Sequence, residues 1–351
     1  MSEPLLQVKN LHTSFAVSSG EVRAVNGVSF NLDRGKVLGI VGESGSGKSV
    51  TAYSIMRILV EPGRITDGQI LFNGDDIVKY SKRQMREFRG SRISIIFQDP
   101  MTSLNPVYTV GNQLREAILL HTNRTHKQAQ ERALEMLELV GVNQPDKRLK
   151  QYPHELSGGM RQRVMIAMAL ACEPDILIAD EPTTALDVTI QAKILELIRS
   201  IQKDRGISVI YITHDLGVVA KVADYVDVMY AGKIVETGTI DEIFYDPRHP
   251  YTWGLLSAMP DLDTADDRLY TIPGSPPNLL HEKPGDAFAP RNQFALKIDD
   301  EVEPPMFKIS DTHYAATWLL DPRAPKVEMP PELQQRIARM KAEAKKIEEA
   351  E

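Results

Sequence analysis

Short apolar, β-branched runs recur along the chain, and segments with a helical spacing of apolar residues separate them. Several runs are almost continuously apolar, which is typical of parallel strands buried on both faces of a sheet. Strands that alternate with helices predict a layered α/β domain. The predicted strands are residues 37–42, 69–74, 93–99, 175–182 and 208–215, and the predicted helices are residues 49–59, 128–141, 159–171 and 189–204.

Two regions depart from this alternation. Residues 6–17 and 25–35 alternate apolar with polar positions, which indicates a small antiparallel sheet near the start. Residues 100–174 carry helical patterning and no convincing strand. The pattern therefore predicts a helical insertion between two strands of the main sheet.

The composition changes near residue 247. Fourteen of the 22 prolines lie in residues 247–351. Because proline removes a hydrogen-bond donor and blocks long helices, we expect a loop-rich appendage there. Residues 331–351 are predicted to be helical, with an apolar stripe that we interpret as a packing face rather than as the site of a partner helix. The stripe consists of Leu333, Ile337, Met340, Ala344 and Ile347.

The overall composition limits the possible partners. A length of 351 residues suits one large domain with an appendage, or two domains. The net charge of −7 argues against general binding to nucleic acid.

The one cysteine, Cys172, excludes an intramolecular disulfide and suits a reducing cytoplasm. The chain starts without the pattern of a secretory signal, and no uncharged apolar run approaches the ~20 residues that span a bilayer, so we expect any membrane association to be peripheral.

A glycine-rich turn connects the predicted strand 37–42 to the predicted helix 49–59. It fits the pattern G-x-x-x-x-G-K-[ST], in which backbone N–H groups surround phosphates. Lys48 would reach the terminal phosphates of a nucleotide, and the Ser49 hydroxyl would bind Mg²⁺. The pattern predicts a nucleotide site formed by Gly42, Glu43, Ser44, Gly45, Ser46, Gly47, Lys48 and Ser49.

Polar side chains stand at the ends of three other predicted strands. Asp180 ends an apolar strand, where α/β sheets place their ligands, and its carboxylate could hold Mg²⁺. Glu181 follows it and could orient or deprotonate an attacking water. Gln98 and His214 also end strands; each is weak by itself, but together with Lys48 and Asp180 they favour one functional site.

Residues 156–163, LSGGMRQR, form a second glycine-containing helix start. Backbone amides at such a start make an anion site. One ATP site does not need two such features, and the local pattern does not say what the second one binds.

In their order along the chain, these motifs resemble those of ABC-transporter ATPases. The phosphate loop is followed by Gln98, LSGGMRQR, Asp180 with Glu181, Ala-Leu-Asp at residues 185–187, and His214. The resemblance covers residues 5–260. It implies an α/β fold with a RecA-like P-loop ATPase core, an antiparallel β subdomain and a helical subdomain, plus a loop-rich C-terminal extension. We expect an ABC nucleotide-binding domain at residues 1–255, its helical subdomain at about residues 100–172, and the extension at residues 256–351.

The resemblance also implies individual roles. Glu181 would be the catalytic base, His214 would contact the γ-phosphate, and Gln98 would sense Mg²⁺ and nucleotide and touch a membrane subunit. Asp187 would link two active sites. Phe15 lies where relatives stack an aromatic on adenine, but it could equally be a core residue of a strand. Ser157, Gly158 and Gly159 would contact the γ-phosphate held by a second subunit, so the protein would work as half of an ATP-clamped pair.

The C-terminal part narrows the resemblance. Residues 249–263 and 272–280 resemble the extension of bacterial oligopeptide and dipeptide importer ATPases. This implies a D-type subunit that uses ATP and Mg²⁺ and pairs with a homologous F-type ATPase. The other implied partners are two transmembrane permease subunits and, indirectly, an extracytoplasmic peptide-binding protein, with the chain at the cytoplasmic face of the cell membrane.

Many such relatives hold an iron–sulfur cluster with four cysteines of this extension. Here Asp286, Asn292 and Thr317 stand where three of those cysteines would fall. Because cluster ligation needs several thiolates, we expect no iron–sulfur cluster.

Three other functions remain open. The first is an importer of nickel or another small solute within the same family. The second is a soluble ABC-type ATPase acting on DNA or ribosomes, although the paired cassettes, long coiled coil or zinc-binding cysteines usual in such proteins are missing from this sequence. The third is a nucleotide-binding subunit without turnover of its own.

Overall fold

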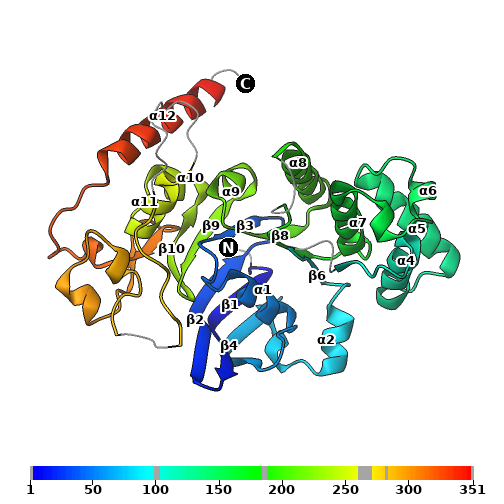
Figure 1. The fold of residues 1–351 in the computed structure, drawn as a ribbon, viewed down its shortest axis with the longest axis horizontal. Coiled ribbons are helices and arrows are strands. Elements are labelled where there is room, and N and C mark those ends of the chain that lie inside the picture. Colours follow the sequence, from blue (N-terminus) through cyan, green and yellow to red (C-terminus); the bar gives the residue numbers. More distant parts are fainter. Residues whose placement is uncertain (1–2, 99–102, 184–187, 260–270, 281–283, 349–351) are drawn as a thin grey trace.

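A mixed sheet of eight strands runs through the centre of the molecule (Figure 1). The computed structural model describes residues 3–98, 103–183, 188–259, 271–280 and 284–348. In spatial order the strands are β11 (Met306–Lys308), β12 (Tyr314–Ala316), β10 (Lys233–Thr239), β9 (Tyr225–Tyr230), β3 (Val37–Val41), β8 (Ser208–Thr213), β7 (Ile176–Asp180) and β6 (Ile93–Ile96). The strands from β9 to β6 are parallel, which confirms the predicted α/β core.

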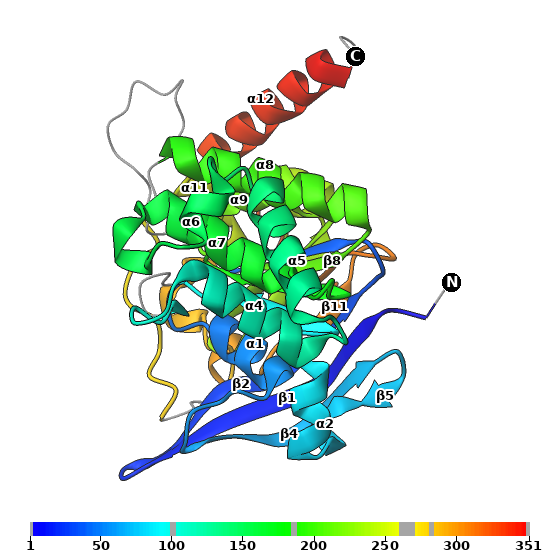
Figure 2. The same ribbon diagram turned by 90° about the vertical axis from the view of Figure 1, so that its right-hand side faces the viewer.

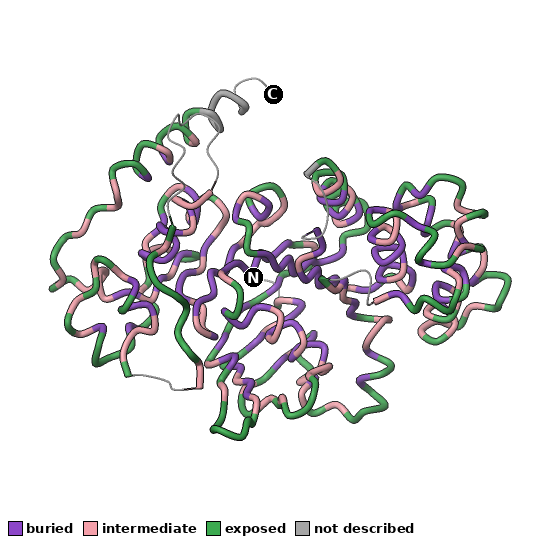
Figure 3. Tube along the Cα trace, viewed as in Figure 1, coloured by how far each residue is buried: buried purple, intermediate pink, exposed green. Residues whose placement is uncertain are grey.

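The parallel strands are buried on both faces, as their continuous apolar runs predict. Leu177 of β7 and Val209 of β8 pack into the core beneath the helices on one side. Ile178 and Ile210, their neighbours in sequence, pack into the core on the opposite side. Buried residues accordingly concentrate along this sheet (Figure 3).

A second sheet of four antiparallel strands lies beside the first, at the lower end of the molecule (Figure 2). Its order is β2 (Gly20–Leu32), β1 (Leu6–Val17), β4 (Gly63–Phe72) and β5 (Asp75–Asp76). Residues 69–72 of the predicted strand 69–74 are the end of β4 and belong to this sheet, not to the parallel one, and residues 73–74 form a turn. Ile70 and Phe72 are buried while Gln69 is exposed, so this strand has one buried face.

Helices connect the strands of the main sheet and cover its faces. Among the described residues between β6 and β7 there are four α-helices and no strand, which confirms the predicted helical insertion. Threonine or serine side chains cap three of these four helices at their first turn. The helices are α1 (Lys48–Met56), α2 (Lys82–Phe88), α4 (Val110–His121), α5 (His126–Leu139), α6 (Pro145–Arg148), α7 (Gly158–Leu170), α8 (Val188–Arg205), α9 (Leu216–Val222), α10 (Ile240–Tyr245), α11 (Pro250–Ser257) and α12 (Pro331–Glu348).

The C-terminal extension is attached to the main sheet, an arrangement that its proline content did not predict. Strand β12 pairs antiparallel with β10, so the hairpin β11–β12 extends the sheet at its edge. Helix α12 packs against α10 and α11, and its Leu333 and Ile337 are buried there. These two side chains support the interpretation of the stripe as a packing face. In the described part of the chain, no helix is long and apolar enough to pass through a bilayer.

Candidate nucleotide site

The glycine-rich turn between β3 and α1 lies tightly against neighbouring backbone. Gly42 and Gly47 have φ of 154° and 102°. A Cβ atom on Gly42 would lie 2.1 Å from the Met229 carbonyl oxygen, and one on Gly47 would lie 2.5 Å from that of Ala24. Only glycine fits these two positions, so the conformation of the turn is fixed by β9 on one side and β2 on the other.

Lys48 is the first residue of α1, and its side chain is turned back into the loop. Its Nζ donates hydrogen bonds of 2.8 Å to the carbonyl oxygens of Gly42 and Glu43. Burial lowers the pKa of Lys48, while the carboxylates of Glu181, Asp180 and Glu43 oppose this shift. The loop therefore holds an ammonium group among three acidic side chains at the ends of the parallel strands.

Ser49 and Asp180, which the sequence predicts as two Mg²⁺ ligands, are in direct contact. The Ser49 hydroxyl donates a hydrogen bond of 2.9 Å to Asp180 Oδ1. Asp180 is fully buried, and burial raises the pKa of its carboxyl, opposed by the hydrogen bond from Ser49 and by the nearby Tyr53 hydroxyl. Oδ2 of Asp180 makes no hydrogen bond of normal geometry to the described residues. A buried carboxylate oxygen of this kind beside a serine hydroxyl is a suitable donor set for Mg²⁺, which prefers oxygen ligands.

Glu181 lies between Gln98 and His214. Gln98 Nε2 donates a hydrogen bond of 3.0 Å to Glu181 Oε2, and His214 Nδ1 lies 3.3 Å from Oε1. The backbone of Glu181 is left-handed, with φ of 46°, and its N–H donates to the Ile212 carbonyl at 2.9 Å. Such a conformation is costly for a non-glycine residue and is typical of functional sites. The structure thus joins the three predicted catalytic residues beside Asp180.

The second helix start is a separate feature. Ser157 caps α7 by accepting a hydrogen bond of 3.3 Å from the Met160 N–H. Ser157 and Gly158 are exposed, and a Cβ atom on Gly158 would contact nothing within 4 Å. In the parts of the chain that the structure describes, the hydrogen-bonded cluster of Lys48, Asp180 and Glu181 contains none of Ser157, Gly158 and Gly159. Ser157 and Gly158 are thus open to solvent at the start of α7, whereas Gly159 is buried and packs against Ile190.

Two other predicted nucleotide contacts are not decided by this geometry. The half-buried ring of Phe15 in β1 packs across the sheet on Gly63, where a Cβ atom would lie 2.5 Å from the ring. That contact is compatible with both a core residue and an adenine platform. Asp187 lies outside the described residues.

The three positions that replace the cysteines of relatives serve as local caps. Asp286, Asn292 and Thr317 each accept a hydrogen bond from the backbone N–H two residues further on, at 2.9, 2.9 and 3.3 Å. Burial raises the pKa of Asp286 to about 6. These side chains stabilise turns of the extension, and the absence of a cluster stays a prediction.

Sequence reasoning missed two residues that bind the glycine-rich loop, namely Tyr251, just before the predicted extension, and Arg291 within it. The Glu43 N–H donates to the Tyr251 hydroxyl at 2.8 Å, and the Arg291 guanidinium makes two hydrogen bonds to the Glu43 carboxylate. Tyr251 lies in a segment that resembles other importers, but the resemblance assigned it no role. No local signal could have found Arg291, because it is 248 residues from its partner.

Comparison with known proteins agrees with this geometry. Residues 25–184 match the ABC transporter family, and residues 235–298 match the C-terminal region of oligopeptide/dipeptide transporters. The chain is 61% identical over 328 residues to the oligopeptide transport ATP-binding protein OppD of Bacillus subtilis, with 93% of this chain and 92% of OppD covered. The chain belongs to the ABC transporter family.

A second curated relative and a solved structure are also similar to this chain. The dipeptide transport ATP-binding protein DppD of Lactococcus lactis is 54% identical over 326 residues, which cover 93% of each chain. Among solved structures, the dimeric ATP-binding cassette MJ0796 bound to ADP and Pi matches with a TM-score of 0.61 and 26% identity, over 67% of this chain and 98% of that one. The predicted ABC-type fold, with its P-loop core, is therefore confirmed.

Proposed function

We propose that this ABC family member is the ATP-hydrolysing subunit of an importer that takes up oligopeptides or dipeptides. The observation that carries the proposal is the cluster in which Gln98 and His214 hold Glu181 beside the hydrogen-bonded pair of Ser49 and the buried Asp180. In such a cluster, Ser49 and Asp180 offer oxygen ligands for a metal ion, and Glu181 offers a carboxylate base beside them. The peptide class rests on the similarity to OppD and DppD.

Within this function, each side chain has a distinct role. Lys48 binds the terminal phosphates, together with the N–H groups of the loop from Ser44 to Ser49. Ser49, Asp180 and Gln98 would hold Mg²⁺, and a bound metal would neutralise charge on the phosphates. Glu181 accepts a proton from the attacking water, and Gln98 and His214 fix the orientation of its carboxylate.

The exposed start of α7 supports a paired mode of action. Ser157 and Gly158 are exposed at the helix start, with the buried Gly159 behind them, and the N-terminus of a helix favours a negative group of another molecule. We propose that this group is the γ-phosphate held by a second ATPase subunit, a homologous F-type chain, and that Asp187 links the two sites. The pair would act on two transmembrane permease subunits at the cytoplasmic face of the membrane and indirectly serve an extracytoplasmic peptide-binding protein. Residues 1–255 would form the nucleotide-binding domain and residues 256–351 the extension.

A nickel or other small-solute importer would use the same ATP chemistry, so the substrate has to be tested directly. The complex is assembled in proteoliposomes with its co-purifying membrane subunits and binding protein, and ATP hydrolysis is measured with oligopeptides, dipeptides or Ni²⁺ outside the ATP compartment. We expect peptides to raise hydrolysis and peptide uptake to depend on ATP. Stimulation by Ni²⁺ alone would replace the peptide assignment, and ATP hydrolysis that needs no membrane subunit and responds to no solute would favour a soluble ATPase.

A further inference from the structure

Glu43, the second residue of the phosphate loop, is bound through its backbone and its side chain. Its N–H donates to the Tyr251 hydroxyl at 2.8 Å. Its carbonyl oxygen accepts from the Ser46 N–H at 3.2 Å and from Lys48 Nζ at 2.8 Å. Its carboxylate accepts from Arg291 at 2.6 and 3.0 Å. Two of these four partners lie within the loop, and the other two come from the C-terminal part of the chain.

Arg291 is built into the extension rather than placed on its surface. Its side chain is 4% exposed, and its Nε donates to the Pro273 carbonyl at 2.8 Å. The guanidinium lies 5.7 Å from the centre of the Tyr230 ring and contacts that hydroxyl at 3.3 Å. The hydrogen bonds to Glu43 raise the pKa of Arg291 further, so the group is charged throughout the physiological range. A planar guanidinium with two parallel hydrogen bonds fixes both the position and the orientation of a carboxylate.

Tyr251 is equally fixed. It is fully buried at the start of α11, with its ring 4.7 Å from that of Tyr230 and 5.3 Å from that of Phe288. Burial raises the pKa of its hydroxyl, which therefore keeps its proton. Three packed rings thus hold one oxygen atom against the backbone N–H of Glu43.

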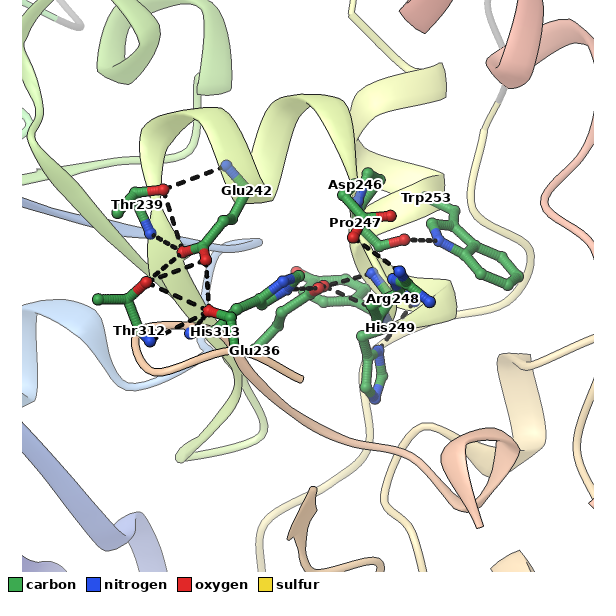
Figure 4. A network of polar contacts seen from close by, with 12 residues as sticks. Glu236, Thr239, Glu242, Asp246, Pro247, Arg248, His249, Trp253, Thr312 and His313 are labelled. Atoms are coloured by element: carbon green, nitrogen blue, oxygen red, sulfur yellow. Dashed lines mark hydrogen bonds and ion pairs between the residues drawn. The ribbon is translucent and has the colours of Figure 1, made fainter. Parts of the chain in front are cut away.

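The start of α11 is itself anchored by a buried polar network (Figure 4). The Glu236 carboxylate in β10 accepts from the N–H groups of Arg248 and His249 at 2.6 and 3.0 Å. It also contacts His313 Nε2 at 2.8 Å, where both side chains are at most 1% exposed. The network joins β10, the segment before Tyr251 and the β11–β12 hairpin. The extension is therefore held to the sheet by this network and by the pairing of β12 with β10, and it is held to the phosphate loop by Arg291.

This arrangement bears on Lys48. Two of the three N–H donors of its ammonium are used on the carbonyls of Gly42 and Glu43, so the position of Glu43 helps to set the position of the charge. Catalytic groups lose much of their effect when they are displaced by about 1 Å. A residue that fixes Glu43 therefore acts on the bound phosphates through Lys48.

We propose that Arg291 and Tyr251 are positioning residues, which hold Glu43 so that Lys48 meets the terminal phosphates of ATP. The proposal rests on the nucleotide site proposed above. It gives the extension a role in ATP binding within its own chain, in addition to any role toward other subunits. It also separates two functions of the extension, namely attachment through Glu236 and His313 and control of the loop through Glu43.

The test uses the full chain in its assembled transporter, with MgATP affinity measured by a fluorescent ATP analogue and KM and kcat measured by phosphate release. We expect Arg291→Lys and Glu43→Gln each to raise Kd and KM about tenfold, the effect of one charge-assisted hydrogen bond. Because both changes break one contact, the double variant should be no worse than either single variant. Tyr251→Phe should raise Kd and KM in the same direction.

Two controls separate positioning from folding. Lys308→Gln removes an exposed ion pair of the extension, with Asp311, and should leave Kd and KM unchanged. His313→Gln weakens the buried contact with Glu236. It should lower the Tm of the protein and leave the Kd for MgATP close to that of the wild type. Three results would overturn the proposal. Arg291→Lys could leave Kd and KM unchanged, or the double variant could show additive effects. Alternatively, Arg291→Lys and His313→Gln could change Kd equally at an equal loss of Tm. A wild-type protein that fails to bind MgATP would instead contradict the proposed function.

Discussion

The Ser49 hydroxyl lies 2.9 Å from Asp180 Oδ1, and this hydrogen bond joins the first turn of α1 to the end of β7. The two residues are 131 positions apart, and β8 separates β7 from β3 in the sheet. Because the parallel strands end at the same edge, the phosphate loop and the acidic strand end meet there. The contact places a hydroxyl and a buried carboxylate where one metal ion could bind both.

Asp180→Asn should weaken nucleotide binding only when Mg²⁺ is present. The neutral amide of asparagine is a poorer ligand for Mg²⁺ than a carboxylate. The substitution also removes a buried carboxylate whose pKa is raised by burial, and this should stabilise the protein without nucleotide. We therefore expect the Kd for MgATP to rise at least tenfold, the Kd for ATP in EDTA to change little, and the Tm without nucleotide to rise. Calorimetric titration with and without Mg²⁺ checks this, with the exposed Asp146→Asn as the matched control. An unaltered Mg²⁺ dependence in Asp180→Asn would remove Asp180 from the metal site.

Glu181→Gln should stop turnover and preserve binding. The amide can still pair with Gln98 and His214, so the local structure is kept, but it cannot accept a proton from water. General-base catalysis contributes about 10²–10⁴-fold, and we expect kcat to fall by that amount while the Kd for MgATP stays within about threefold. Phosphate release and nucleotide titration measure the two quantities, and Glu87→Gln, an exposed residue of α2, is the control. Steady-state hydrolysis at the wild-type rate would exclude Glu181 as the base.

The fold and this cluster were predictable from local patterns because its members lie at or just after the ends of apolar strands, or in the loop that follows one. Asp180 and Gln98 could be placed by reading where β7 and β6 end. The apolar pattern did not say to which sheet residues 69–74 belong, because a short apolar run does not reveal whether one face or two are buried. The contact of Arg291 with Glu43 could not be read at all, since it depends on how the extension folds back over the sheet.

Gly158→Asp should prevent ATP-dependent pairing without disturbing the fold. A Cβ atom at this position meets nothing within 4 Å, so the side chain has room. Its charge would repel a γ-phosphate presented to the start of α7. We expect MgATP to bind normally at the chain's own loop, and association with the second ATPase subunit and hydrolysis each to fall more than about tenfold. Sedimentation with MgATP, in a Glu181→Gln background, measures the association.

Gly158→Ala provides the neutral control for that experiment. Because it adds a methyl group and no charge, it should pair nearly as the parent does. Pairing by Gly158→Asp at the parent level would mean that this helix start does not face a phosphate.

Asp227 in β9 is a buried carboxylate outside the nucleotide site. It is 2% exposed, and its Oδ1 accepts a hydrogen bond of 2.6 Å from the Thr237 hydroxyl on β10. Oδ2 makes no hydrogen bond to the described residues. Burial raises the pKa of Asp227 to about 7, opposed only by the contact with Thr237.

Asp227→Asn should therefore stabilise the protein at pH 8 more than at pH 5. Between pH 4 and 7 the unfolded chain ionises this carboxyl while the native state keeps the proton, so the free energy of unfolding falls as the pH rises. Above pH 7 the penalty is complete, and it amounts to at most about 4 kcal/mol. Asparagine resembles the protonated acid and carries no such penalty. Urea unfolding at both pH values tests this, with the exposed Asp311→Asn as control. The free energies of unfolding of Asp227→Asn and wild type could differ by the same amount at pH 5 and at pH 8. That result would show that Asp227 is ionised in the native state at both pH values.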